Sequence, residues 1–262
     1  MIVHERDHDF IMIRQHDHAQ VSGEAAKHWK TEFFPGFERH EDVILGIYQH
    51  DRAWIELDDT PLWNDRNHVP YSFVDFPSSL KLTFYRKGID EVEVINPYAG
   101  LLCSLHYASF FENDTHPAGQ EFLRSERKRQ QGLVQRLHLH GATMDELQFH
   151  FRLLQFCDNL SLYLCLNEPG VSKSDEFPWY RNGFSGSDQF SFTKNRVIMA
   201  HWIDKERVSL SPSPFEKEVQ VSLMTKAVDK ERIKVVGIAQ AYQDAAWTER
   251  KVSFVGIINF NT

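Results

Sequence analysis

Two neighbouring ionisable residues, His50 and Asp51, fall within an apolar helical pattern. Val43, Ile47, His50, Asp51 and Trp54 follow the i, i+4, i+7, i+8, i+11 spacing of one helix face. This spacing predicts that the His50–Asp51 pair faces the core. A buried imidazole and a buried carboxylate cost free energy unless they are paired or bound to a metal ion.

Two other helical segments each place one ionisable residue on an apolar face, His18 in the first and Asp158 in the second. The apolar faces contain Val21, Ala25 and Trp29 around His18, and Leu147, Phe151, Leu154 and Cys165 around Asp158. One divalent cation could satisfy all of these inward-facing groups together. Imidazole and carboxylate suit Mn²⁺, Fe²⁺, Co²⁺ or Zn²⁺ better than Ca²⁺. The alternative is a set of independent buried residues with separate partners.

The order of these residues along the chain resembles the HD-domain phosphohydrolase superfamily. "DHAQVSGEAA" around His18 is similar to the helix of the first histidine, and "VILGIYQHDRAW" to the helix that ends in the His-Asp dipeptide. "LLQFCDNLSLYLC" is similar to the late helix that supplies the final aspartate. This resemblance covers about residues 15–166. Over its whole length the chain also resembles an uncharacterised bacterial family with a domain of unknown function, which implies no substrate.

The superfamily resemblance implies an all-helical fold around one metal ion. The implied ligands are His18, His50, Asp51 and Asp158. Such an ion lowers the pKa of a bound water and polarises a phosphoryl oxygen, and Asp51 could also orient the attacking water. The chain departs from the pattern after the dipeptide, where many members have a small residue and a lysine. Here residues 52–54 are Arg-Ala-Trp and an acidic segment follows at 56–59, so the phosphate contact is unassigned.

The candidate catalytic residues are Asp51, His106 and Asp58. His106 lies in the apolar segment "LLCSLHYASFF". It could be a further metal ligand or a base lining the pocket, and the alternative is a core histidine bonded to a carbonyl. Asp58 follows the dipeptide closely and could bond a substrate hydroxyl or amine. Helix capping is an equally good account of Asp58.

The candidate substrate contacts are Trp54, Arg86, Lys87 and His150. Trp54 could stack on a ring of the substrate, and His150 could face the same cleft as the late aspartate. Lys81, Arg86 and Lys87 are candidates for holding a phosphate, since a guanidinium presents a planar fork to phosphate oxygens. The alternative for these cations is a solvated helix face.

The elements that must position these residues are mainly helices. Helical patterns span residues 17–32, 38–54, 78–87, 97–111, 118–139 and 143–166. Residues 1–15 predict a β-hairpin around the polar turn at 7–9, and residues 56–76 predict a long loop. Residues 167–189, rich in Gly, Ser and Pro, predict a linker or a loop.

The hydrophobic period changes in the last 70 or so residues. Residues 219–223 alternate apolar and polar, and 233–238 and 252–258 are β-branched runs, so we expect an antiparallel sheet that the N-terminal hairpin could join. The prediction is mainly α, an HD-type helical bundle with a β-rich C-terminal portion, and α+β overall. A helical metal-binding domain would span 15–166, with a sheet portion of 1–14 and 190–262 packed on it.

Composition and charge narrow the classes of function. The chain has 262 residues, of which 42% are hydrophobic, enough to bury a core. A formal net charge of −8 disfavours a nucleic-acid polymer or an anionic membrane as partner. The sequence has no apolar run long enough for a membrane span and no apolar signal-peptide core, so we expect a cytoplasmic location. Three cysteines without a CxxC pair argue against a disulfide framework or a zinc ribbon.

Two functions follow from these observations. The first is a metal-dependent phosphohydrolase that uses one divalent ion (Mn, Fe, Co, Zn or Mg) and acts on a small phosphorylated molecule such as a nucleotide. The alternative is a non-catalytic metal-binding, ligand-binding or sensory module of HD-like fold. In that case the C-terminal sheet would mediate self-association into a homo-oligomer. The missing lysine and the acidic segment favour the alternative.

Overall fold

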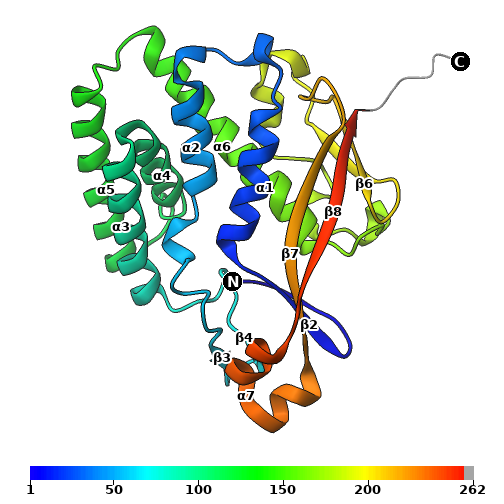
Figure 1. The fold of residues 1–262 in the computed structure, drawn as a ribbon. Helices are drawn as coiled ribbons and strands as arrows, with labels where there is room; N and C mark the ends of the chain where they lie inside the picture. Colours follow the sequence, from blue (N-terminus) through cyan, green and yellow to red (C-terminus); the bar gives the residue numbers. More distant parts are fainter. Residues whose placement is uncertain (257–262) are drawn as a thin grey trace, which may run out of the picture.

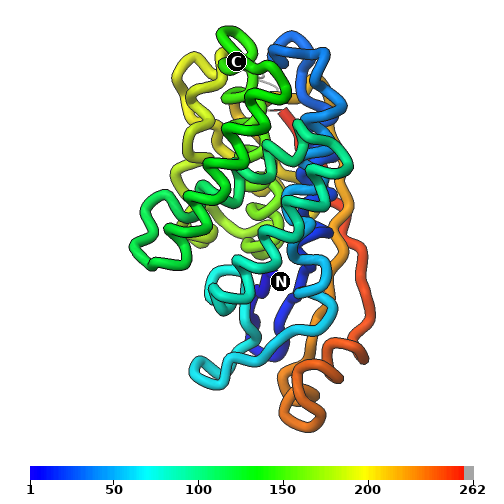
Figure 2. The backbone as a smooth tube through the Cα atoms, turned by 90° about the vertical axis from the view of Figure 1, so that its left-hand side faces the viewer, coloured from blue at the N-terminus to red at the C-terminus, as the bar shows by residue number. Residues whose placement is uncertain are grey.

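A computed structural model of the chain describes residues 1–256. In these residues a layer of helices packs beside a six-stranded sheet, and the long elements run roughly lengthwise in the molecule (Figure 1). Figure 2, turned by 90°, shows the strands along one side of the helices and the C-terminal helix at the lower end. The predicted α+β class, with an N-terminal hairpin and C-terminal strands in one sheet, is therefore confirmed.

Seven α-helices and seven short 3₁₀ turns lie within residues 1–256. Helices α1 to α7 span Gln15–Lys27, His40–Gln49, Ser78–Ile95, Pro97–Ser109, Pro117–Arg136, Ala142–Leu166 and Lys230–Asp244. Turns η1 to η7 span Thr31–Phe33, Phe37–Arg39, Arg52–Trp54, Lys173–Asp175, Pro178–Tyr180, Ser187–Gln189 and Ser191–Thr193. Helix α4 begins where the Asn96 side chain accepts the backbone N–H groups of Tyr98 and Ala99, with Pro97 in the first turn.

The main sheet has the strand order β1-β2-β7-β8-β6-β5. These strands span Ile2–Glu5, Asp9–Ile13, Val219–Asp229, Trp247–Gly256, Arg207–Ser211 and Met199–Trp202, in that order. Strand β7 pairs with β2 and with β8, and so joins the N-terminal hairpin to the C-terminal strands. Alternate residues of β7 are buried over much of its length, as expected for a strand with one face on the core.

Helix α1 lies at the centre of the packing. It contacts α2 and α6 on one side and β7 on another. The largest hydrophobic core joins helices to sheet and includes Ile13, Leu160 and Leu223, all of them buried. Burying each such side chain contributes about 1.5–3 kcal/mol relative to leaving it exposed, so sheet and helices stabilise one another. The division into a helical domain at 15–166 and a sheet portion stays a prediction.

Three predicted helices differ by five residues or more from the structure in where they end. The pattern 17–32 becomes α1, which ends at Lys27, and the pattern 38–54 becomes α2, which ends at Gln49 and is followed by the separate turn η3. The pattern 78–87 becomes α3, which continues to Ile95. Glycine disfavours a helix interior, but Gly88 sits in the middle of α3 because the backbone of Ala53 in η3 packs directly against it.

The predicted strand at 233–238 is wrong, because these residues lie in helix α7. The Asp229 side chain accepts the backbone N–H of Arg232 and caps the helix, and capping with packing overrides the β-branched composition. The sheet is also mixed rather than antiparallel, because β6 and β8 pair in parallel. Of the predicted strand at 252–258, residues up to Gly256 lie in β8, and 257–258 fall outside the described residues.

The two predicted loops contain short ordered elements. Strands β3 (Trp63–Asn64) and β4 (Val69–Pro70) form a small hairpin within 56–76. The stretch 167–189 holds the turns η4, η5 and η6. Within residues 1–256, none of the helices combines the length and the hydropathy that crossing a bilayer requires.

The contact between α3 and η3 makes Gly88 a test of the packing. In Gly88→Ala the new Cβ would lie 2.7 Å from the Cα and N atoms of Ala53, so the two elements must separate. We expect the free energy of unfolding to fall by about 1–3 kcal/mol, measured by urea denaturation. The control is Gly132→Ala in α5, where nothing lies within 4 Å of the added Cβ. That change should stabilise by up to about 1 kcal/mol, and equal effects of both variants would contradict the packing argument.

Candidate metal centre

Four buried side chains from α1, α6 and the end of α2 converge on one point. They are His18 in α1, His50 and Asp51 directly after α2, and Asp158 in α6. His18 Nε2 lies 2.7 Å from Asp51 Oδ2 and 3.7 Å from Asp158 Oδ1. His50 Nε2 lies 3.7 Å from Asp51 Oδ2 and 3.4 Å from Asp158 Oδ1. All four predicted ligands are therefore brought together, with His18, His50 and Asp51 in one group that could hold a metal ion and Asp158 within 3.7 Å of both histidines.

The end of helix α2 orients His50. The last carbonyls of a helix lack partners within the helix, and the Ile47 carbonyl accepts the Nδ1–H of His50 at 2.6 Å. This bond leaves Nε2 as the nitrogen that faces the carboxylates. Nε2 has no hydrogen-bond partner in the part of the chain that the structure describes. A buried nitrogen without a partner, aimed at two carboxylate oxygens, is a good donor for a cation.

Ser161, one turn after Asp158 in α6, orients His18. Ser161 Oγ donates to the backbone carbonyl of Asp158 at 2.9 Å and lies 2.5 Å from His18 Nδ1. The serine oxygen therefore accepts the Nδ1–H of His18, and Nε2 turns to the carboxylates. Both histidines thus use Nδ1 for a second hydrogen bond, which is how metal-ligating histidines are usually held.

His106, in α4, lies against the same cluster. Its ring centroid is 5.0 Å from that of His50 in an edge-to-face arrangement, and His50, His106 and Asp158 form a second group that could hold a metal. Among the described residues, His106 Nδ1 has no hydrogen-bond partner. Three imidazoles and two carboxylates therefore meet in this cluster, a donor set that suits a transition metal.

Burial and charge act against each other in the cluster. Burial disfavours a charged imidazole, but Asp51 and Asp158 outweigh it and raise the pKa of His50 to about 9. Burial would raise the pKa of both carboxyls, yet the neighbouring histidines hold the pKa of Asp51 and of Asp158 below its usual range. Burial lowers the pKa of His106 to about 4. Without a metal, the cluster therefore holds a protonated His50 beside two ionised carboxylates, and a metal cation would take the place of that proton.

A cavity of about 520 Å³ reaches the cluster. His18, Asp51, His106 and Asp158 line it together with aromatic residues of several elements. Lys81 of α3 is the cation among the residues that line this cavity, and its Nζ donates to the Phe73 carbonyl at 3.2 Å. Burial lowers the pKa of Lys81. The volume lies within the range of small-molecule sites, and the cluster and Lys81 share its wall.

Of the candidate substrate contacts, Trp54 lines this cavity. The indole is fully buried and packs edge-on against Phe76 and Tyr85, with centroid distances of 5.5 and 5.9 Å. Arg86 and Lys87 do not line it. Arg86 lies over the Phe122 ring at 5.4 Å, and the ammonium of Lys87 pairs with Glu56.

Asp58 and His150 make other contacts. Asp58 is buried, and its carboxylate accepts the amine of Met1 and the backbone N–H of Gln15. His150 donates from Nε2 to the Pro35 carbonyl at 2.9 Å and accepts from the Tyr98 hydroxyl at 2.7 Å. Neither residue lines the cavity, and their contacts account for their burial. Their roles in catalysis and substrate binding stay predictions.

Comparison with known proteins decides the family. The family model described as "Protein of unknown function (DUF3891)" matches residues 1–230. The chain belongs to the DUF3891 family. Searches of curated proteins and of solved structures found no match. The match extends from β1 to the first residue of α7 and so includes every residue of the cluster.

The DUF3891 chain also places residues at the cavity that the sequence analysis did not select. Asn159 follows Asp158 directly, and Trp179 lies in η5 with 53% of its surface exposed. Phe110, which directly follows α4, also lines the cavity. The position of Asn159 beside a candidate ligand was a usable signal. Trp179 gave none, because it lies in a Gly-, Ser- and Pro-rich stretch without a period.

His150 is a buried, neutral imidazole that makes two hydrogen bonds, and this state predicts that stability depends on pH. Burial lowers the pKa of His150 to about 4, below the value of about 6.5 expected in the unfolded chain. Between these values the unfolded chain binds the extra proton, so the free energy of unfolding should fall as pH drops from 6.5 to 4. The contribution of this residue is up to about 3 kcal/mol. Urea denaturation of wild type and His150→Gln across this range should show a shallower fall in the variant, and parallel curves would refute the assignment.

Proposed function

We propose that this protein is a metal-dependent phosphohydrolase that acts on a small phosphorylated molecule. The observation that carries the proposal is the convergence of His18, His50, Asp51 and Asp158, of which all but His50 line a cavity that Lys81 also lines. A protein that only needed a structural ion would not require an adjoining cavity of small-molecule size.

The order of the ligands supports a place in the HD-domain superfamily as part of the proposal. A histidine on one helix, a His-Asp dipeptide at the end of the next and an aspartate on a late helix form the arrangement that the sequence resemblance implies. The DUF3891 description carries no activity, so the reaction rests on the geometry and on this resemblance. The candidate cations are Mn²⁺, Fe²⁺, Co²⁺, Zn²⁺ and Mg²⁺.

The residues of this chain have distinct roles in the proposal. A bound divalent ion supplies Lewis acidity, which lowers the pKa of water and polarises a phosphoryl oxygen. Lys81 replaces the lysine absent after the dipeptide, since it lines the same cavity from α3 and its ammonium can hold a phosphate oxygen. His106 lines the cavity as a neutral imidazole and can accept a proton from the attacking water.

The ligand set can be tested by metal content and activity together. Asp158→Asn and His50→Gln remove one donor each while they keep the side-chain volume. We expect elemental analysis to find stoichiometric metal in the wild type and to find it lost from both variants. The turnover of a panel of phosphoesters should fall at least 100-fold in both variants. The matched control, Asp145→Asn, changes an exposed carboxylate on the same helix and should keep both.

Two outcomes would overturn the proposal. Wild-type protein without bound metal after loading with Mn²⁺, Co²⁺, Zn²⁺ or Mg²⁺ would refute the metal site. Metal bound by the wild type and lost from both variants, with no phosphoester turned over, would assign the alternative function of a non-catalytic metal-binding or sensory module.

The role of Lys81 predicts a separation of substrate binding from metal binding. Lys81→Met removes a charged hydrogen bond of about 1.5–3 kcal/mol, so kcat/KM should fall about 10- to 100-fold while metal content stays unchanged. Lys87→Met is the matched control, because Lys87 lies on the same helix but outside the cavity. Equal kinetics for the two variants would exclude Lys81 as the phosphate contact.

A further inference from the structure

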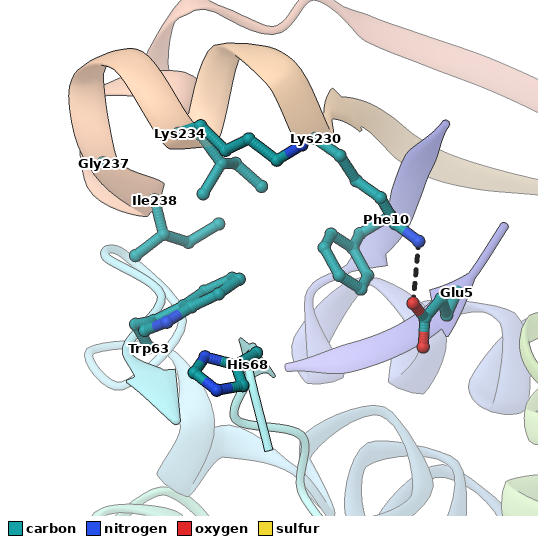
Figure 3. Close-up of a pocket in the computed structure, with 9 residues that line it drawn as sticks. Glu5, Phe10, Trp63, His68, Lys230, Lys234, Gly237 and Ile238 are labelled. Carbon is teal, nitrogen blue, oxygen red and sulfur yellow. Dashed lines mark hydrogen bonds and ion pairs between the residues drawn. The ribbon is translucent and has the colours of Figure 1, made fainter. Parts of the chain in front are cut away.

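A second cavity lies between the β1–β2 hairpin, the β3–β4 hairpin and α7 (Figure 3). It has a volume of about 590 Å³. It shares no lining residue with the cavity of about 520 Å³ that reaches the His–Asp cluster, here called the metal cavity. Its wall consists of Glu5, Phe10, Trp63, His68, Lys230, Ile233, Lys234, Gly237 and Ile238. Three segments distant in sequence therefore enclose a space of small-molecule size.

The wall of this second cavity is mostly aromatic and aliphatic. Trp63 and His68 lie on one side and Phe10 on another, with Ile238 above the indole (Figure 3). The rings of Trp63 and Phe10 meet edge-to-face with centroids 6.4 Å apart, and Ile233 and Ile238 are buried. The faces of Trp63 and His68 offer stacking surfaces for a flat ring.

His68 occupies a backbone conformation that favours glycine. Its φ is 56°, and its N–H donates to the Asn64 carbonyl at 2.8 Å to close the turn between β3 and β4. A left-handed conformation costs a non-glycine residue about 1 kcal/mol. The turn nevertheless carries an imidazole there, and the ring points into the cavity (Figure 3). Strain of this kind is often found at binding sites.

The charge of the wall is opposite to that of the whole chain. Lys230 and Lys234 line the cavity together with one carboxylate, Glu5, whereas the chain has a net charge of −8. Lys230 pairs with Glu5 at 2.7 Å, and Lys234 pairs with Glu231 in a largely exposed pair. Exposed ion pairs contribute about 0–1 kcal/mol, so the Lys234 ammonium can turn to an anionic ligand at little cost. Lys230 is 24% exposed, and its ammonium also lies 4.8 Å from the centroid of the Phe10 ring.

We infer that this second cavity binds a small planar aromatic molecule that bears an anionic group, a carboxylate or a phosphate. The ring would stack on Trp63 and His68, and the anion would pair with Lys234, with Lys230 adding positive charge to the wall. Four of the lining residues, from Ile233 onward, follow the segment that the family model matches. The inference stands independently of the proposed phosphohydrolase activity, because none of the metal-cluster residues takes part.

A fluorescence titration with 8-anilinonaphthalene-1-sulfonate, itself an aromatic anion, tests the site on the full chain. We expect one saturable site from which 2-naphthoate or 2-naphthyl phosphate displaces the probe, and the better competitor identifies the anion. The cation 2-naphthylmethylammonium should compete at least tenfold more weakly. Equal competition by the cation, or no saturable binding, would overturn the inference.

Single-residue variants test whether the probe binds in the second cavity. Trp63→Ala and Lys234→Glu should weaken probe affinity about tenfold, whereas Trp179→Ala at the metal cavity should leave it unchanged. Lys234 is exposed, so Lys234→Glu keeps the test valid if Trp63→Ala does not fold.

His68→Gly gives a readout that a purely structural role would not produce. It should weaken probe binding while the free energy of unfolding stays equal or rises, because glycine relieves the left-handed turn. Unchanged affinity in the Trp63, Lys234 and His68 variants, or weaker binding in Trp179→Ala, would place the probe elsewhere and refute the site.

Discussion

The structure of this protein depends on two buried carboxylates, Asp51 and Asp158. Both lie beside the same two histidines, His18 and His50, inside the core. An ionised carboxylate is costly to bury and stays charged only where positive charge or strong hydrogen bonds compensate. Here the neighbouring histidines hold the pKa of both carboxyls low, and the carboxylates in turn raise the pKa of His50. Helices α1, α2 and α6 must pack in one arrangement to keep these groups together.

The end of α2 is the local feature that makes this arrangement work. If the helix continued to Trp54, the Ile47 carbonyl would be used within the helix and His50 would lose its Nδ1 partner. Because α2 ends at Gln49, that carbonyl accepts the Nδ1–H of the imidazole, and Asp51 is the N-cap residue of the separate turn η3. The close packing of η3 on Gly88 then fixes α3, which carries Lys81 to the cavity.

The two cavities share one supporting segment although they share no lining residue. Trp63 and His68 border the second cavity, and Phe73 and Val74, a few residues later, border the metal cavity. The Phe73 N–H donates to the Met1 carbonyl, and the Met1 amine pairs with Asp58. This segment is therefore tied to Met1, the residue before β1. Asp58 acts in that attachment, which explains why a carboxylate so close to the dipeptide is buried away from the metal cavity.

The sequence by itself determined the helix faces, and through them the four candidate ligands. Periodicity shows which side of a helix is buried, so an ionisable residue on an apolar face, such as His18 or Asp158, can be recognised without coordinates. The same reasoning predicted the α+β class and the hairpin joined to a C-terminal sheet. It did not separate His106 as a ligand or base from a core histidine, since a buried face does not reveal what it touches.

Only the tertiary structure decided the end of α2, the helix at 230–244 and the residues that share a cavity. Helix ends depend on capping and on packing against distant segments, as Asp229 and Gly88 show, and these forces exceed local β or turn preferences. Lys81 reaches the metal cavity and Lys87 does not, although both lie on α3. That difference arises because the neighbours of a helix face come from elsewhere in the chain, which a local pattern cannot specify.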